Sequence, residues 1–394
     1  MESLCDVFTD GDWIEAKDQS DSGIRLIQTG NVGTTEYLDK ENNKKWISEE
    51  TFERLHCKEI YEGDILVSRL PEPAGRACIM PNLGIRMITA VDCTIVRTSK
   101  EYDRKYLVQY LSTPMYFKEV NSFLGGGTRQ RISRGNLSGI DIPIPSTIDE
   151  QGKIGEFFAN LDHLITLHQR ECEQAKKYKK YMLQKMFPQN GSNVPEIRFS
   201  GFTHPWEQRK LPEFVTFYNG QTYTPDDVQE SGTLVLRSSN VKNGEIVDAD
   251  NVYINPEIAS ADNVQEGDII VVVRNGSRAL IGKHAQIKDP KPNTVIGAFM
   301  SGMRSEHSSF VNALLDTSAF ENEIAKNMGA TINQITGYMF SKMEFVIPTD
   351  DEQEKIGEYF ANLDHLITLH QHKPIQQIIY RNNQQFYNVY FGRR

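Results

Sequence analysis

The sequence predicts an α+β chain in which two globular units are separated by two long helices. Three observations support this prediction. A long segment occurs twice with almost no change. Shorter pieces echo one another, in the same order, before each copy. The repeated segment has helical periodicity, whereas β-branched runs in the globular units, such as Ile269 to Val273, indicate buried strands.

The repeated segment is the strongest feature of the sequence. Residues 149–169 read DEQGKIGEFFANLDHLITLHQ, and residues 351–371 read DEQEKIGEYFANLDHLITLHQ. Only the fourth and ninth letters differ, which chance does not produce. Internal repetition of this kind means that one structural plan is used more than once.

Weaker echoes precede each copy. The matched pieces are, in chain order, IQTGNV (27–32) and LRSSNV (236–241), EGDILVSR (62–69) and EGDIIVVVR (266–274), GGGTRQRISRGNL (125–137) and MGATINQITGYMF (328–340), and the strand-like IDIPIP ending at Pro145 and EFVIP ending at Pro348. Residues 102–120 and 308–327 each suggest one or two helices. The chain is therefore a globular unit and a helix, used twice.

The first long helix is expected over residues 149–187, with Asp149 as its N-cap and acidic residues in its first turn. Positions spaced alternately by four and three form a heptad seam with two polar interruptions. The seam is Ile154, Phe158, Leu161, Ile165, His168, Cys172, Ala175, Lys179, Met182 and Met186. The expected domains are 1–148, the helix 149–187, a Pro/Gly/Asn-rich linker 188–198, a second globule 199–350, and a C-terminal helix with a divergent tail, 351–394.

The second helix departs from the first after Gln371, where HKPIQQIIYRNNQQFYNVYFGRR replaces RECEQAKKYKKYMLQKMF. Pro374 is expected to stop or kink it, because proline removes a backbone donor and clashes with the preceding turn. Asparagine, a poor helix former, is frequent there.

Composition excludes several classes of protein. The chain is 39% hydrophobic and 24% charged, as soluble globular proteins are. No apolar run could span a bilayer and no signal core opens the chain, so we expect a cytoplasmic protein. Its five scattered cysteines form no C-x-x-C pair, which argues against a disulfide framework or a zinc site. The net charge of −10 argues against a free-standing DNA binder, unless basic residues cluster or partners supply the phosphate contacts.

Catalytic signatures are weak or missing. FLGGG at 123–127 loosely matches a methyl-donor loop, but the second unit has NMGAT there and no Asn-Pro-Pro-aromatic motif occurs. A flexible turn near DNA is the better interpretation. No phosphate-binding P-loop exists. The acid pairs at 226–227 and 350–351 are better explained as turn and cap residues than as metal ligands. His163 and His365 precede the next histidine by five residues, which disfavours metal binding on one helix face. We therefore expect neither catalysis nor a metal in this chain.

The repeated helix keeps residues that core packing does not require. Identical off-seam positions suggest one partner surface presented twice, although an unselected gene conversion remains the alternative. The predicted partner-binding residues are Asn160, Asp162, His163, Thr166 and Gln169, with Asn362, Asp364, His365, Thr368 and Gln371.

This alternation of variable globule and near-identical helix resembles the specificity subunits of type I restriction–modification enzymes. GDWIEAKDQSDSGIRLIQTGNV, QRISRGNL, GFTHPWEQRKL and EQGKIGEFFANLDHLITLHQ are similar to recurring segments of that family, and the resemblance runs from residue 1 to about 371. It implies two target-recognition domains that each read half of a bipartite, asymmetric DNA site. It also implies two long helices, packed as an antiparallel coiled coil, that hold the half-sites apart.

The same resemblance implies the partners. Two methyltransferase subunits bind the helices, and a translocating nuclease subunit joins them. Methylation and cleavage then belong to those partners, and so do S-adenosylmethionine, ATP and magnesium. A rival interpretation is an assembly adaptor or regulator of that complex that does not itself read DNA.

Candidate DNA-binding residues lie in loops at parallel places in the two units. Arginine pairs bidentately with guanine, and asparagine or glutamine with adenine. Phosphate contacts, or a loop with no DNA role, are the alternatives. The predicted residues are Arg129, Gln130, Arg131 and Arg134 with Asn333 and Gln334, and, in second rank, Gln28, Thr29 and Asn31 with Arg237, Ser239 and Asn240. The second-rank set has a further alternative, which is that these side chains satisfy the backbone of a turn.

Overall fold

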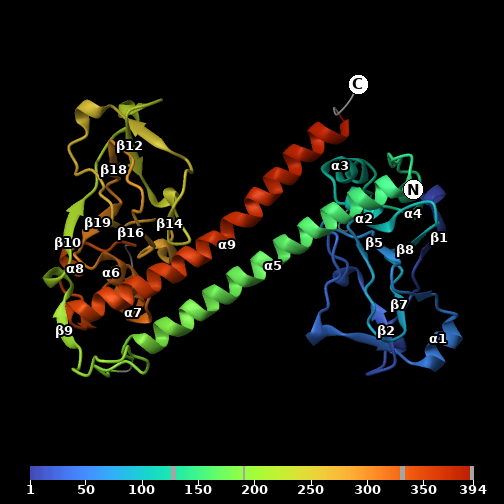
Figure 1. Cartoon of the computed structure of the whole chain (residues 1–394), viewed down its shortest axis with the longest axis horizontal. Coiled ribbons are helices and arrows are strands. Elements are labelled where there is room, and N and C mark those ends of the chain that lie inside the picture. Colours follow the sequence, from blue (N-terminus) through green and yellow to red (C-terminus); the bar gives the residue numbers. More distant parts are fainter. Residues whose placement is uncertain (126–129, 190, 329–332, 391–394) are drawn as a thin grey trace. The chain divides into compact units, whose positions relative to one another are not determined.

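The computed structural model describes residues 1–125, 130–189, 191–328 and 333–390, with side chains described as far as Gln371. The chain forms two compact units, Met1–Leu167 with Pro374–Arg394, and His168–Lys373. Each unit combines strands and helices, as Figure 1 shows, so the predicted α+β class is confirmed. No helix among the described residues is long and apolar enough to cross a membrane.

The first unit contains two four-stranded sheets, ordered β1-β8-β5-β6 and β3-β2-β7-β4. The strands are β1 (Cys5–Asp10), β2 (Ile24–Ile27), β3 (Lys45–Ile47), β4 (Glu59–Ile60), β5 (Ile65–Ser68), β6 (Ala77–Ile79), β7 (Met87–Thr89) and β8 (Cys93–Thr98). The helices are α1 (Glu49–Leu55), α2 (Arg104–Tyr110), α3 (Pro114–Ser122), α4 (Arg134–Ser138) and the long α5 (Ile148–Met186).

The second unit repeats the order of the first sheet and, in the second sheet, the three strands β3-β2-β7 as β15-β12-β18, but its fourth strand, β11, lies at the opposite edge from β4. Its main sheets are ordered β10-β19-β16-β17 and β11-β15-β12-β18, beside the two-stranded sheets β13-β14 and β20-β9. The strands are β9 (Glu207–Lys210), β10 (Thr216–Asn219), β11 (Val228–Gln229), β12 (Thr233–Leu236), β13 (Val241–Lys242), β14 (Glu245–Ile246), β15 (Val252–Ile254), β16 (Ile269–Val272), β17 (His284–Gln286), β18 (Thr294–Ile296), β19 (Met300–Arg304) and β20 (Glu344–Ile347). The helices are α6 (Ser308–Leu315), α7 (Ser318–Asn327), α8 (Gly337–Phe340) and the long α9 (Asp350–Tyr390).

The central strands β5 and β16 are buried on both faces, which explains their apolar sequences. Ile65 and Val67 pack with the helices α2 and α3, whereas Leu66 faces the second sheet. In the other unit, Ile269 and Ile270 divide in the same way between two apolar cores. The predicted strand at 269–273 and the predicted helices at 102–120 and 308–327 are confirmed.

Each long helix approaches a helix of its own globule very closely. A Cβ atom at Gly155 would lie 2.4 Å from the backbone nitrogen of Tyr106 in α2, and one at Gly357 would lie 2.7 Å from that of Phe310 in α6. Only glycine fits such an approach. These identical residues of the repeat therefore serve contacts inside the chain.

An identical glutamine near the start of each long helix ties that helix to the segment before it. The buried Gln151 donates a hydrogen bond to the Pro145 carbonyl at 3.1 Å, and Gln353 donates to the Pro348 carbonyl at 3.0 Å. Each glutamine thus fixes the entry of the chain into the helix.

Within the second unit, α5 and α9 run antiparallel. Glu171, Cys172 and Lys179 of α5 contact His370, Ile367 and Asp364 of α9, at 3.1, 3.9 and 2.6 Å respectively. Residue numbers rise along one helix as they fall along the other. Met182 and Met186 continue the buried seam into the core of the globule. The predicted antiparallel packing of the helices is thus confirmed for this stretch.

Two expectations about the ends of these segments were wrong. Residues 140–145 belong to no strand, unlike the matched β20, because Pro143 and Pro145 remove two of the donors that a ladder needs. Pro374 does not stop the second helix, which runs from Asp350 to Tyr390, and the expected kink stays a prediction. Losing one hydrogen bond does not end a helix whose other turns remain bonded on both sides.

Lys179, a polar interruption of the seam, lies between two carboxylates. Its ammonium is 2.6 Å from both Asp316 and Asp364, and its side chain is only 13% exposed. Burial alone would lower the pKa of Lys179, but the two negative charges outweigh it and the pKa lies above its ordinary value. The cation therefore holds together helix α5, helix α9 and the end of α6.

We predict that Lys179→Ala destabilises the chain by about 2 kcal/mol, because two partly buried carboxylates would lose the ammonium between them and, among the described residues, only Asp316 would keep an ion-pair partner, His284 at 3.4 Å. Lys180→Ala, a change at the exposed neighbouring residue, should stay within about 0.5 kcal/mol of the wild type. Urea unfolding followed by circular dichroism measures both. Equal unfolding midpoints for the two variants would contradict the role of Lys179.

Candidate nucleic-acid interface

In the first unit, the predicted DNA-binding loop is fastened to the end of the central strand β5. Ile132 is fully buried, and its N–H donates to the carbonyl of Arg69 at 3.2 Å. Gly125 and Arg131 exchange backbone hydrogen bonds of 3.2 and 3.0 Å, which close the base of the loop. Gln130 is exposed at that base. Arg129, like the glycines of the FLGGG motif after Gly125, lies outside the described residues.

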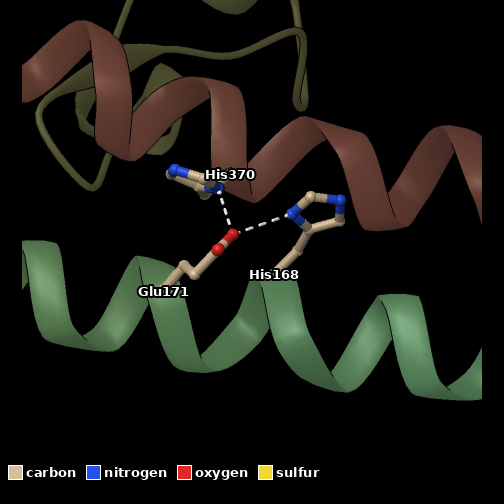
Figure 2. A group of neighbouring side chains, drawn as sticks. All are labelled: His168, Glu171 and His370. Carbon is tan, nitrogen blue, oxygen red and sulfur yellow. Dashed lines mark hydrogen bonds and ion pairs between the residues drawn. The ribbon is translucent and has the colours of Figure 1, made fainter.

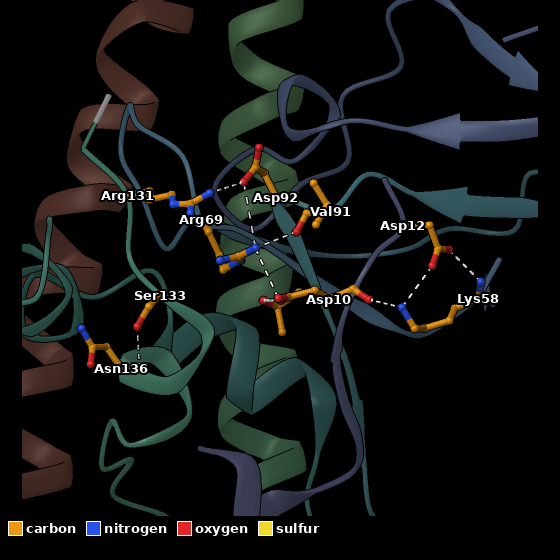
Figure 3. Close-up of polar contacts among 10 residues, drawn as sticks. Asp10, Asp12, Lys58, Arg69, Val91, Asp92, Arg131, Ser133 and Asn136 are labelled. Carbon is orange, nitrogen blue, oxygen red and sulfur yellow. Dashed lines mark hydrogen bonds and ion pairs between the residues drawn. The ribbon is translucent and has the colours of Figure 1, made fainter. Parts of the chain in front are cut away.

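Arg131 extends from this base into solvent, as Figure 3 shows. Its side chain is 60% exposed, and one guanidinium nitrogen lies 3.5 Å from the carboxylate of Asp92. An exposed pair of this kind contributes at most about 1 kcal/mol, so the guanidinium is free to exchange partners. Arg134 is also exposed, at the first residue of α4, whose N-cap Ser133 accepts from the N–H of Asn136 at 3.0 Å.

Arg69 is the buried counterpart of Arg131. Its side chain is only 7% exposed, and its guanidinium donates to the Val91 carbonyl at 2.7 Å and lies 3.3 Å from Asp10 (Figure 3). Asp92 lies 3.9 Å from the same guanidinium, so it is shared by a buried and an exposed arginine. Arg69 thus supports the loop, whereas Arg131 is the group that can reach a ligand.

The loop at residues 28–32 is organised mainly for its own structure. Asn31 is buried; its side chain accepts from the N–H of Gln28 at 3.0 Å and donates to the Leu38 carbonyl at 2.9 Å. Arg76 donates to the carbonyls of Thr29 and Val32. For Asn31 the structure favours the alternative that its side chain satisfies the backbone. Gln28 and Thr29 are half-buried and remain candidates.

The second unit uses the same anchor. The N–H of Ile335, which is 1% exposed, donates to the Val273 carbonyl at 2.9 Å, just after β16. The side chain of Asn333 donates to the Gly276 carbonyl at 3.0 Å, and Gln334 pairs with Arg274 through the backbone. Residues 329–332 before them lie outside the described residues. The match between Ile132 and Ile335 is therefore structural as well as sequential.

The loop at 237–240 also repeats its counterpart. Asn240 is fully buried, accepts from the N–H of Arg237 at 2.9 Å, and donates to the Ala249 carbonyl at 2.8 Å. Arg237 is paired with Asp250 at 2.6 Å. Ser239 is exposed. Asn240, like Asn31, thus has a structural role, and Arg237 must leave Asp250 to contact DNA.

The segment after β16 joins the two predicted loops of this unit. Asn275 donates from its side chain to the Ser238 hydroxyl at 3.1 Å, and from its backbone to the Asn333 carbonyl at 3.4 Å. Arg274 is exposed and lies 5.1 Å from the ring centre of Phe299, which is 57% exposed. An exposed arginine–aromatic pair can stack on a base or contact phosphate.

The sequence contained an indication that the residues after β16 belong to the candidate interface, and our prediction did not use it. The matched pieces EGDILVSR and EGDIIVVVR both end in arginine, Arg69 and Arg274, after a buried strand. Exposed Arg278 follows in the second unit. Arg274 and Arg278 therefore join the candidate interface.

The predicted partner-binding residues of the long helices divide into two groups. Asp162, Asp364 and Thr368 have partners inside the chain, namely Gln109, Lys179 and Glu245. Thr166 and Gln371 are half-buried. The exposed residues are Asn160, His163 and Gln169 with Asn362 and His365, beside the exposed leucines Leu164, Leu167, Leu366 and Leu369.

Comparison with known proteins identifies the family. The profile described as "Type I restriction modification DNA specificity domain" matches residues 3–177 and again residues 203–378. The chain belongs to this family. The resemblance seen in the repeated helices is thereby confirmed, and the two matches coincide with the two copies of the globule-and-helix plan.

Individual relatives agree with this assignment. The chain is 24% identical, over 84% of its length and 80% of the relative's, to the type I restriction enzyme MjaVIII specificity subunit of Methanocaldococcus jannaschii. It is 25% identical to the StySPI specificity subunit of Salmonella potsdam, over 40% of this chain and 36% of that one. A crystal structure of the S subunit from M. genitalium has the same fold, with a TM-score of 0.66 at 15% identity, covering 97% of this chain and 92% of the other.

We predict that Arg131→Ala weakens DNA binding about tenfold or more and relaxes the preference at one base pair, if its guanidinium pairs with guanine. Contact with phosphate alone would weaken all sequences equally and reduce the salt slope by about one. Affinities for a panel of single-base variants at two salt concentrations separate the two results. The matched control is Lys100→Ala, at an exposed residue beyond the opposite end of β8 from Asp92. Unchanged affinity and salt slope in Arg131→Ala would show that this loop does not face DNA.

Proposed function

We propose that this chain is the DNA-reading subunit of a type I restriction–modification enzyme, and that each globule reads one half of a bipartite, asymmetric site. The observation that carries the proposal is the double match to the specificity-domain family, each match covering one globule and its helix. The two globules share the order of their first main sheet but carry different polar residues in the matched loops, such as Arg131 and Asn333. Different loops on one framework suit two different half-sites.

We further propose that equivalent surfaces of the two helices each bind one methyltransferase subunit, and that a translocating nuclease subunit joins the complex. Asn160, His163, Leu164 and Leu167 are exposed and follow the i, i+3, i+4, i+7 spacing of one helix face. Asn362, His365, Leu366 and Leu369 repeat that face. Exposed leucines flanked by polar side chains favour a protein partner.

Catalysis is proposed to belong to the partner subunits, with S-adenosylmethionine, ATP and magnesium bound there. A second candidate function is an assembly adaptor that does not read DNA. The net charge of −10 favours it, because a reader usually carries excess cations. Retention of the assembled complex on cognate DNA, compared with the methyltransferase subunits alone, decides between them. The domain boundaries at 148/149, 187/188, 198/199 and 350/351 belong to the same proposal.

We predict that replacing residues 1–145 with the first globule of another family member changes only one half of the methylated site. Each globule has its own core and its own contacts with its long helix, so the other half should be unaffected. Methylome sequencing of cells that carry the hybrid measures both halves. A change in both halves would refute independent reading.

We predict that one chain binds two methyltransferase subunits, and that Leu366→Glu removes one of them. A buried charge in an apolar contact costs several kcal/mol, enough to lose a subunit at micromolar concentration. Leu164→Glu should remove the other copy, and the double variant both. Lys177→Glu, on the exposed part of α5 outside the repeat, is the control. Native mass spectrometry reports the stoichiometry. A one-to-one complex of the wild type with saturating partner would disprove the two equivalent surfaces.

A further inference from the structure

Two histidines and a glutamate meet where helices α5 and α9 pack together in the second unit (Figure 2). Nδ1 of His168 and Nδ1 of His370 both lie 3.1 Å from the same carboxylate oxygen of Glu171. One ligand atom from each of the three residues lies within 4.8 Å of the others. None of its three residues belongs to the loops of the candidate DNA interface.

The spacing of these atoms is close to that of a metal site. Metal–ligand bonds of about 2.1 Å in a tetrahedral zinc site separate neighbouring ligand atoms by about 3.4 Å. The glutamate oxygen already lies near this distance from both imidazoles. The three side chains are 16% to 41% exposed, so they are not locked in place by complete burial.

His370 supplies an independent observation. Its Nδ1 atom is buried and has no partner with hydrogen-bond geometry, although Glu171 lies 3.1 Å away. A buried ring nitrogen without a hydrogen bond is costly, and a metal ion would satisfy its lone pair. The rings of His168 and His370 are 5.7 Å apart, so both can turn toward one ion.

The ligand chemistry selects the class of ion. Two imidazoles and a carboxylate suit zinc and its late first-row neighbours, whereas magnesium and calcium require oxygen ligands. Three protein ligands leave a fourth coordination position on the ion for water. Because Glu171 is 41% exposed, solvent can reach that position.

The site depends on the pairing of the two helices. His168 and His370 occupy the same position of the repeated segment, but the residue three places later is Glu171 in one copy and Lys373 in the other. Neither copy alone offers the three ligands. The five-residue spacing of histidines along one helix therefore did not reveal a site whose ligands come from two helices.

We propose that His168, Glu171 and His370 bind one zinc-class divalent cation, which clamps α5 to α9. The ion would replace the sharing of one carboxylate oxygen by two imidazoles with three direct bonds. This inference does not rest on the proposed DNA-reading function. It extends to any ion with the ligand preference of zinc, and zinc is the probe that tests it.

The test is calorimetric titration of the metal-free full chain with zinc chloride. We expect one ion per chain, and a rise of the thermal unfolding midpoint with zinc that a chelator reverses. His168→Ala, His370→Ala and Glu171→Gln should each weaken binding at least about 100-fold, because loss of a second-shell partner alone costs about 10–100-fold. Cobalt should give the visible absorption of a tetrahedral site without a thiolate band, since Cys172 is not among the ligands.

His204→Ala is the matched control, because this histidine is exposed in the same unit. Its affinity for zinc should equal that of the wild type. Circular dichroism without zinc checks that each variant folds. If a histidine variant does not fold, Glu171→Gln, which preserves the size of the side chain and an oxygen acceptor, tests whether the cluster binds zinc. No binding at micromolar zinc, or binding that the Glu171→Gln and histidine variants retain, would overturn the proposal.

Discussion

The close approach of each long helix to one helix of its globule, α2 or α6, is the contact on which the rest of the structure depends. Gly155 and Gly357 permit backbone contacts that any side chain would prevent. Gln151 and Gln353 hold the preceding segment at the same point. Because these residues are identical in the two copies, each globule is placed on its own helix by the same contacts, whatever its loops carry.

This constraint changes the interpretation of the repeat. Identity beyond the heptad seam suggested a partner surface, yet glycine and glutamine are kept for contacts inside the chain. Asp162 and Asp364 also have partners there, Gln109 and Lys179. The proposed partner surface is therefore narrower than the repeat, and it is the exposed stripe around Leu164 and Leu366.

Most of the architecture could be predicted from the sequence, because long periodic segments and apolar runs determine it. The helix expected at 149–187 is observed at Ile148–Met186, and the run after Asp268 is the strand β16. The strand order could not be predicted, because pairing between distant strands leaves no local pattern. The strand expected at 140–145 failed for a local reason, its two prolines.

The candidate interface was predicted less completely. The loop of Arg131 became a candidate because a local cluster of basic residues stands out in an acidic chain, and it stays a prediction. Asn31 and Asn240 were predicted to contact DNA, but the structure favours a role in closing their own turns. The sequence alone does not distinguish such an asparagine from one that contacts a base. Neither Arg274 nor the His168–Glu171–His370 cluster was predicted from the sequence. Only the folded structure shows which side chains are exposed and which helices meet.

The sharing of Asp92 between Arg69 and Arg131 has a consequence for the search for a target. Asp10 and Asp92 offset the charge of Arg69, and Asp92 offsets part of that of Arg131, so these two arginines together add little net positive charge. Attraction to the phosphate backbone is the same for every sequence, and weakening it shortens every encounter with a wrong one. If this loop faces DNA, the shared carboxylate should therefore lower affinity for every sequence and shorten the stay on non-target DNA, which favours discrimination over retention.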